Sequence, residues 1–262
     1  MRVATWNVNS VRARIERIVP WLEESAPDVV LLQETKADDG QFPSATLAAL
    51  GYESAHYGQG RWNGVAILSR VGLRAVERGL ADGEARMISA LCGPLRATSC
   101  YVPNGRALDD PHFAAKLRWL DALRDRREDR DRGVPEVIGG DFNVAPADLD
   151  CYDPASFVGA THVSGAERAA LDALEATGLT DAWRHLHPHE PGYTWWDYRA
   201  GAFHLDHGLR IDLLLVEDSL VPALEAATVD REARRGPKPS DHAPVWIDLA
   251  LESDTHRVEV DV

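Results

Sequence analysis

The sequence predicts an α/β protein built on mixed β-sheets. Short apolar runs typical of strands, such as residues 64–68 and 88–91, lie between longer segments with helical periodicity. The two kinds of segment do not alternate strictly, which favours mixed sheets over an all-parallel sheet. No Ser/Gly-rich linker divides the 262 residues, and 45% apolar residues are enough for a sizeable core. We therefore expect one domain over residues 1–250, followed by an acidic tail over residues 251–262.

Three helices are predicted from their capping residues and from apolar residues at helical spacing. The first covers residues 10–25, and Pro20 should kink its last turns. The second runs from Asp110 into the charged segment 124–132, which we interpret as a solvated helix end and loop. The residues that cap or close the three helices are Asn9 or Ser10, Asp110 with Pro111, and Ser164 with Glu167 and Gly178.

Polar side chains that carry oxygen atoms accompany five of the apolar runs. A buried carboxylate has a high desolvation cost unless a cation or donor compensates it, so this pattern indicates a divided metal site. Oxygen ligands suit a hard cation such as Mg²⁺ or Mn²⁺. Taken singly, each residue has an ordinary alternative, a strand-end acid facing water or a tight turn. The polar residues are Asn7, Gln33 with Glu34, Asp141 with Asn143, Asp212, and Asp241 with His242.

The segment Ser240-Asp241-His242 places a titratable group directly beside a candidate ligand. Asp212, from a neighbouring strand, is a candidate for fixing the imidazole tautomer, as an acid does in many hydrolases. A plain surface turn remains the alternative for this segment when it is considered by itself.

The net charge of −14 argues against non-specific attraction to nucleic acid, because phosphate contacts normally need a basic surface. One short segment is basic, in contrast to the acidic total. Arg231, Arg234, Arg235 and Lys238 immediately precede Asp241, at a place where a phosphate backbone could approach. Local charge therefore matters more than the total charge.

The chain has neither a signal-peptide pattern nor an uninterrupted apolar run of about 18 residues, so we expect no membrane span and a cytoplasmic location. Cys92, Cys100 and Cys151 are too few and too irregularly spaced for a metal cluster or a disulfide framework. We expect them to be buried or idle thiols.

Seven segments, in order along the chain, resemble motifs of one known family. The chain is similar to the exonuclease III type of apurinic/apyrimidinic endonucleases, within the wider endonuclease/exonuclease/phosphatase superfamily. The resemblance covers about residues 1–250, with a single catalytic domain of this type. Its motifs are Thr5-Trp6-Asn7-Val8-Asn9-Ser10-Val11, Leu32-Gln33-Glu34-Thr35-Lys36, Tyr101-Val102-Pro103-Asn104-Gly105, Gly140-Asp141-Phe142-Asn143-Val144-Ala145-Pro146, Tyr193-Thr194-Trp195-Trp196-Asp197-Tyr198-Arg199, Leu209-Arg210-Ile211-Asp212 and Ser240-Asp241-His242-Ala243-Pro244.

The resemblance implies a four-layer α/β sandwich, in which two mixed sheets pack face to face with helices outside. It also implies an active site at one end of the sheets that binds Mg²⁺ (or Mn²⁺). Its implied metal ligands are Asn7 and Glu34, with Asp241, Asp141 and Asn143 as candidates for a second position and His242 as a further candidate.

The same resemblance assigns roles in catalysis. His242, oriented by Asp212, would contact the scissile phosphate, and Tyr101 is associated with the same phosphate. Asp141 would activate water or protonate the leaving oxygen, and Asn143 would stabilise the transition state. Which of these groups is the general base stays open.

Further residues would bind DNA under this resemblance. Trp195, Leu209 and Ile211 would wall a pocket for an extruded abasic sugar, with ordinary core packing as the alternative. The other implied DNA-binding residues are Asn104, which would support the phosphate site, Arg106 and Arg199.

The function implied is a divalent-metal-dependent DNA-repair phosphodiesterase. It would cleave double-stranded DNA 5′ to abasic sites, process blocked 3′ ends as an exonuclease or phosphatase, or do both, and we expect a monomer. One alternative is a phosphodiesterase or phosphatase for a lipid or small-molecule phosphate, which the acidic charge suits. Another is a nucleic-acid-binding module that has lost catalysis.

Overall fold

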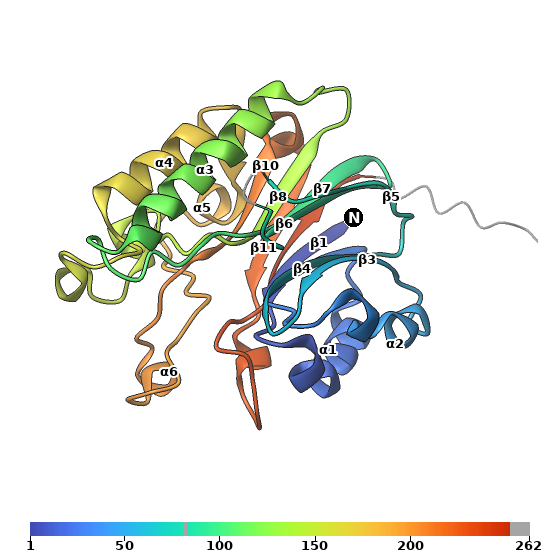
Figure 1. Ribbon diagram of the computed structural model, residues 1–262, viewed down its shortest axis with the longest axis horizontal. Coiled ribbons are helices and arrows are strands. Elements are labelled where there is room, and N and C mark those ends of the chain that lie inside the picture. Colours follow the sequence, from blue (N-terminus) through green and yellow to red (C-terminus); the bar gives the residue numbers. More distant parts are fainter. Residues whose placement is uncertain (81–82, 252–262) are drawn as a thin grey trace, which may run out of the picture.

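The computed structural model describes residues 1–80 and 83–251. These residues form two six-stranded sheets packed face to face, with helices on both outer surfaces (Figure 1). This arrangement confirms the predicted four-layer α/β sandwich. Most of the predicted acidic tail, residues 252–262, lies outside the described residues.

The two sheets are each formed by strands from distant parts of the chain. The first contains, in spatial order, β11 (Leu224–Val229), β12 (Val245–Leu249), β1 (Arg2–Asn7), β2 (Val29–Gln33), β4 (Trp62–Ser69) and β3 (Glu53–Gln59). The second contains β5 (Arg74–Arg78), β6 (Met87–Cys92), β7 (Leu95–Tyr101), β8 (Glu136–Asp141), β10 (Asp212–Glu217) and β9 (Leu179–Asp181).

Both sheets are mixed, as the sequence predicts. β1 pairs in parallel with β2, and β7 pairs in parallel with β8, whereas the other strand pairs described are antiparallel. Val3 faces Val29 on one side and Ile247 on the other. The two ends of the chain therefore meet within one sheet, which brings residues near position 7 close to residues near position 242.

Helices form the two outer layers (Figure 1). Trp6, Ile18 and Leu22 belong to the apolar cluster that packs α1 on the first sheet, and Leu120 and Leu171 belong to the cluster that packs α3 and α4 on the second. The helices are α1 (Val11–Ser25), α2 (Ser44–Ala48), α3 (Pro111–Asp129), α4 (Gly165–Glu175), α5 (Ala182–Leu186) and α6 (Ala202–Leu205). Short 3₁₀ turns lie at Asp39–Gln41, Asp148–Asp150, Pro154–Phe157, Asp218–Ala223 and Arg231–Arg234.

The core lies between the inner faces of the two sheets. Leu31 and Ile67 from the first sheet share one buried cluster with Val137 and Leu214 from the second. Because this cluster joins the sheets, it fixes how the ends of their strands face one another.

The three predicted helices are present with the expected caps. Ser10 Oγ accepts from the backbone N of Ala13, and Asp110 accepts from the backbone N of His112 at 2.8 Å. Ser164 and Glu167 form the predicted capping box. Pro20 lies on the exposed side of α1 and does not end it, since the helix continues to Ser25.

The charged segment 124–132 is only partly solvated, which corrects its interpretation from sequence. Arg127 on α3 is fully buried, and its Nη2 lies 2.9 Å from Glu217 Oε2.

Cys92, Cys100 and Cys151 are buried free thiols. None of the helices in the described part of the chain combines the length and apolar character needed to span a bilayer.

Candidate active site

The polar ends of four strands meet at one end of the sandwich. Asn7 ends β1, Glu34 follows β2, Asp141 ends β8 and Asp212 begins β10. Parallel pairing of β1 with β2 places Asn7 beside Gln33, and antiparallel pairing of β8 with β10 places Asp141 opposite Asp212. The strand pairing of both sheets therefore gathers these groups at one end of the sandwich.

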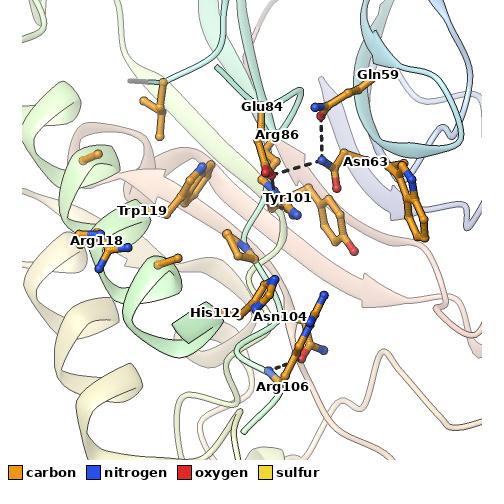
Figure 2. Close-up of a pocket in the computed structure, with 15 residues that line it drawn as sticks. Gln59, Asn63, Glu84, Arg86, Tyr101, Asn104, Arg106, His112, Arg118 and Trp119 are labelled. Atoms are coloured by element: carbon orange, nitrogen blue, oxygen red, sulfur yellow. Dashed lines mark hydrogen bonds and ion pairs between the residues drawn. The ribbon is translucent and has the colours of Figure 1, made fainter. Parts of the chain in front are cut away.

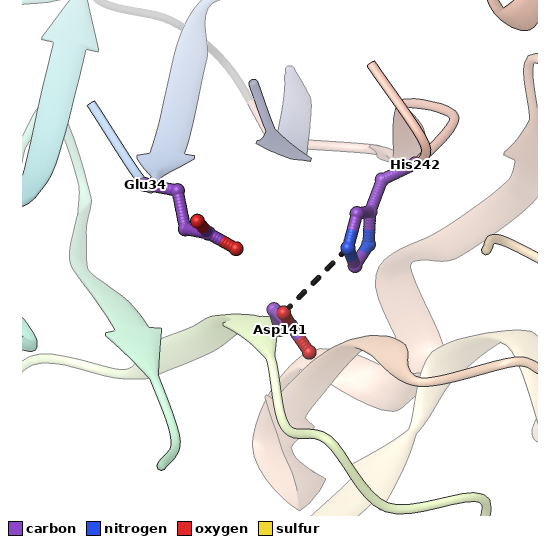
Figure 3. A group of neighbouring side chains, drawn as sticks. All are labelled: Glu34, Asp141 and His242. Carbon is purple, nitrogen blue, oxygen red and sulfur yellow. Dashed lines mark ion pairs between the residues drawn. The ribbon is translucent and has the colours of Figure 1, made fainter. Parts of the chain in front are cut away.

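Three side chains from separate segments converge at the centre of this end of the sandwich. Figure 3 shows Glu34, Asp141 and His242 pointing toward one another from different parts of the fold. Their ligand atoms all lie within 4.8 Å of one another, and His242 Nε2 is 3.8 Å from Asp141 Oδ2. Asp141 and His242 are almost fully buried, at 2% and 4% exposure.

Asn7 links the two carboxylates of this group. Its Nδ2 donates to Glu34 Oε1 at 2.9 Å and to Asp141 Oδ2 at 3.0 Å, while its Oδ1 accepts from the backbone N of Asn9. In this orientation the two carboxylates accept both N–H groups of the Asn7 amide. Asn7 therefore holds the two predicted ligands at a fixed separation.

The turn that carries Glu34 has an unusual backbone. Glu34 and Lys36 have φ values of +50° and +49°, a region that side-chain-bearing residues seldom adopt. The turn is held by a bond from the backbone N of Ser10 to the Glu34 carbonyl at 2.7 Å, and by Thr35 Oγ1, 2.8 Å from His56 Nε2. Lys36 Nζ lies 2.6 Å from Glu34 Oε2, a partner that sequence analysis did not identify although Lys36 belongs to a matching motif.

His242 is fixed on its other side by Asp212. Nδ1 of the imidazole lies 2.8 Å from Asp212 Oδ2. Burial by itself lowers the pKa of His242, but the Asp212 and Asp141 carboxylates raise it to about 10. The two carboxylates therefore favour the imidazolium form, and Nε2 lies on the cavity side, 3.8 Å from Asp141 Oδ2.

Asp141 has the opposite kind of shift. Burial raises the pKa of its carboxyl to about 7, Asp212 acts in the same direction, and His242 opposes it. A β-carbon on the preceding Gly140 would lie 1.8 Å from the carbonyl oxygen of Cys100, so only glycine allows the strand to end here. A nearby divalent cation would favour the ionised form of Asp141.

Asn143 is held in a tight turn after Asp141. Its backbone has φ +53°, and its backbone N donates to Asp141 Oδ1 at 2.9 Å. Its Nδ2 donates to the Val102 carbonyl at 2.9 Å, and its Oδ1 accepts from Asn104 at 3.2 Å. The oxygen and the nitrogen of the Asn143 side chain therefore each have one protein partner, which leaves one N–H and one oxygen lone pair available.

A buried ion pair contacts the backbone of this turn. The sequence alone did not indicate that the pair has a role in the site. Lys116 Nζ contacts Glu167 and donates to the Asn143 carbonyl at 2.6 Å, with both charged side chains fully buried. Glu167 also accepts from Thr161 at 2.7 Å. Burial by itself raises the pKa of Glu167, but Lys116 and these hydrogen bonds lower it to about 2.

Tyr101 borders the same cavity at the end of β7. Burial raises the pKa of its hydroxyl well above 10, and Glu34 and Asp141 add to this effect. Its ring lies 4.8 Å from the Arg86 guanidinium carbon. Tyr101 therefore remains a neutral hydrogen-bond donor.

Asp241 lies beside the central group but is engaged elsewhere. Its Oδ1 accepts from Asn9 Nδ2 at 3.0 Å, and its Oδ2 accepts from Trp195 Nε1 at 3.1 Å. Trp195 also pairs with His242 and Leu209 through isolated bridges. Asp241 thus ties the predicted sugar pocket to the histidine segment.

The predicted DNA-binding residues separate into two groups. Trp195, Leu209 and Ile211 share one apolar cluster, in which Leu209 and Ile211 are buried and Trp195 is partly exposed. Arg106 and Arg199 are exposed, and Arg199, at 87% exposure, is paired with Asp197 rather than joined to the central group.

The donor set at this site fits a hard divalent cation. Glu34 and Asp141 supply carboxylate oxygens within a partly buried cavity, and one oxygen of Asp212, Oδ1, is buried without a hydrogen-bond partner among the described residues. Carboxylates held this close repel one another unless a positive charge lies between them. The site therefore combines a carboxylate pair that could hold one divalent cation with a buried histidine beside it.

Comparison with known proteins identifies the family of this chain. The chain is 32% identical to exodeoxyribonuclease III of Haemophilus influenzae, over 95% of this chain and 100% of that protein. Two solved structures each superpose with a TM-score of 0.93 over 96% of this chain and 100% of theirs. They are the 3′-5′ exonuclease NExo of Neisseria meningitidis, at 41% identity, and an AP endonuclease of Archaeoglobus fulgidus, at 33%.

The chain belongs to the endonuclease/exonuclease/phosphatase family, which it matches over residues 4–242. Its similarity to named exonucleases and endonucleases over nearly its whole length makes it a nuclease-type hydrolase. The resemblance inferred from the motifs is thereby confirmed.

Proposed function

We propose that this protein is a DNA-repair phosphodiesterase that cleaves DNA 5′ to abasic sites, processes blocked 3′ ends, or does both. The convergence of Glu34, Asp141 and His242 in one cavity carries the proposal. It is supported by relatives whose names are exodeoxyribonuclease III, 3′-5′ exonuclease and AP endonuclease. Residues 1–250 would act as one catalytic domain, in a monomer.

Glu34 and Asp141 would hold the cation, which we propose to be Mg²⁺ or Mn²⁺. Asn7 would keep the two carboxylates in place through its N–H groups. Asn143 and Asp241 would act mainly through the hydrogen bonds already described. When bound, the ion would neutralise the scissile phosphate and stabilise the leaving oxygen as a Lewis acid.

The side chains would share the remaining chemistry. Hydrolysis forms a bond from a water oxygen to phosphorus and breaks the bond from phosphorus to O3′, while one proton leaves the water and another reaches O3′. Asp141 would take the first proton or supply the second, because its buried carboxyl faces the cavity beside His242. His242 and Tyr101 would donate hydrogen bonds to the phosphate oxygens.

The substrate would be double-stranded DNA with a lesion at the cleavage point. Trp195, Leu209 and Ile211 offer an apolar wall next to His242, suited to a sugar that has lost its base. The net charge of −14 favours a second candidate, a phosphatase for a lipid or small-molecule phosphate.

One assay tests the proposal. Duplex oligonucleotides carrying an abasic analogue or a 3′-phosphate are incubated with Mg²⁺, with Mn²⁺, and with a chelator. Metal-dependent incision or release of phosphate is expected on at least one of them. Inertness on DNA with hydrolysis of inositol or lipid phosphates would support the second candidate. Binding without cleavage would indicate a nucleic-acid-binding module.

A further inference from the structure

A second cavity adjoins the site across Tyr101. It has a volume of about 740 Å³ and lies between the β3–β4 turn, the loop after Tyr101 and helix α3. Figure 2 shows Tyr101 on one side of this cavity, and Arg118 with Trp119 on the α3 side. We call it the α3 pocket. Tyr101 lines the α3 pocket and pairs with Asp141 in the register of β7 and β8, so it borders both the pocket and the proposed cleavage point.

The lining of the α3 pocket is more basic than the protein as a whole. Its charged residues are three arginines, Arg86, Arg106 and Arg118, and one glutamate, Glu84, which contacts Arg86. Neither the Arg106 nor the Arg118 guanidinium forms an ion pair with a described residue. In a chain of charge −14, two such arginines in one cavity indicate an anionic ligand.

A tryptophan stands among the residues that line the α3 pocket. Trp62, at the start of β4, is 64% exposed, whereas the Trp119 ring in the same lining is buried. The Arg61 guanidinium carbon lies 5.5 Å from the centre of the Trp62 ring, and Arg106 and Arg118 belong to the same cavity lining. An exposed indole together with arginines is the combination with which proteins bind unpaired nucleotides, by stacking on bases and neutralising phosphates. In a duplex the base faces are covered by neighbouring pairs, so stacking of this kind requires an unpaired base.

We propose that the α3 pocket binds unpaired nucleotides of the DNA strand that flanks the scissile phosphate. Trp62 stacks on a base, and Arg106 and Arg118 contact phosphates of the same strand. This inference rests on the proposed nuclease function and specifies its substrate: ends and gaps where the flanking strand is not paired.

Binding to two matched DNA molecules tests the proposal. Both carry the same 3′ end, and they differ only in whether the adjacent nucleotides are paired. Affinity is measured by fluorescence anisotropy in chelator, with wild type, Trp62→Ala, Trp62→Phe and Arg118→Ala. Arg74→Ala is the matched control, because Arg74 is exposed and pairs with Leu91 at the opposite end of the sheet from Tyr101.

Trp62→Ala should weaken binding to the unpaired DNA roughly 5- to 150-fold, the loss of one stacked base, with a markedly smaller effect on the paired DNA. Trp62→Phe should restore most of this loss, because phenylalanine keeps an aromatic face. Arg118→Ala should reduce the slope of log Kd against log salt by about 0.7 on the unpaired DNA. Arg74→Ala should change neither affinity.

Equal losses on both DNA molecules would overturn the inference, because the pocket would then contact duplex backbone. Absence of any loss would also overturn it. Cleavage of DNA by the wild-type enzyme is scored separately: if neither DNA is cut in Mg²⁺ or Mn²⁺, the proposed function itself fails, whatever the binding data show.

Discussion

Nδ1 of His242 lies 2.8 Å from Oδ2 of Asp212, and both side chains are almost completely buried. The pair fixes which imidazole nitrogen faces the cavity. It also raises the pKa of His242, because a buried carboxylate at this distance favours the imidazolium.

Asp212→Asn should therefore lower kcat by about 10²- to 10⁴-fold, since the amide keeps the size of the side chain but removes the orienting charge. The Kd for DNA should change little, because Asp212 is buried behind the histidine. Steady-state kinetics and a binding assay measure the two effects. Asp121→Asn, on the exposed side of α3, is the control. Undiminished turnover would remove Asp212 from the site.

Metal binding should be visible without any measurement of activity. Adding Mg²⁺ should raise the Tm of the wild-type protein, because a ligand at about 100 times its Kd stabilises the folded state by about 2.7 kcal/mol. Glu34→Gln should remove most of this rise, since it removes one of the charges that attract the cation. Glu53→Gln, at an exposed position of β3, should preserve it. Equal shifts in the two variants would exclude Glu34 as a ligand.

The buried ion pair between Lys116 and Glu167, which lies next to Asn143, should contribute to the free energy of unfolding. Lys116→Met should lower the free energy of unfolding by about 3–5 kcal/mol, because it leaves the Glu167 carboxylate buried without its cation. Denaturant titration measures this loss. The double variant Lys116→Met/Glu167→Gln should lose less than Lys116→Met alone. A larger loss in the double variant would show that the pair is not the source of the effect.

Glu175 on α4 should make stability depend on pH. Burial raises its pKa from the ordinary value to about 7, with Asp181 adding to the effect. The folded state thus holds the Glu175 proton more tightly than the unfolded state does. The stability that this proton contributes is fully present below about pH 4.5 and is lost as the pH rises through 7.

Glu175→Gln should accordingly stabilise the protein at pH 8 by about 1–2 kcal/mol, a figure reduced for partial solvent access, and have little effect near pH 4.5. Urea titrations of both proteins at the two pH values measure the difference. The same gain at both pH values would contradict the shift.

Local sequence alone determined the strand-end polar residues and the three helix starts. Ser10, Asp110 and Ser164 cap their helices because a side-chain oxygen placed just before a helix bonds a free backbone N–H, whatever the rest of the fold does. Glu34 and Asp141 could likewise be recognised from the sequence, because a carboxylate that ends an apolar strand needs a compensating partner.

Only the tertiary structure decided how those groups face one another. Asn7 bonds both Glu34 and Asp141, which are 27 and 134 residues away, and Lys116 meets Glu167 across 51 residues. Such contacts depend on strand order, on register and on the packing of one sheet against the other, and no local pattern encodes them. For the same reason Arg127, within a run of charges typical of a solvated helix end, is fully buried beside Glu217.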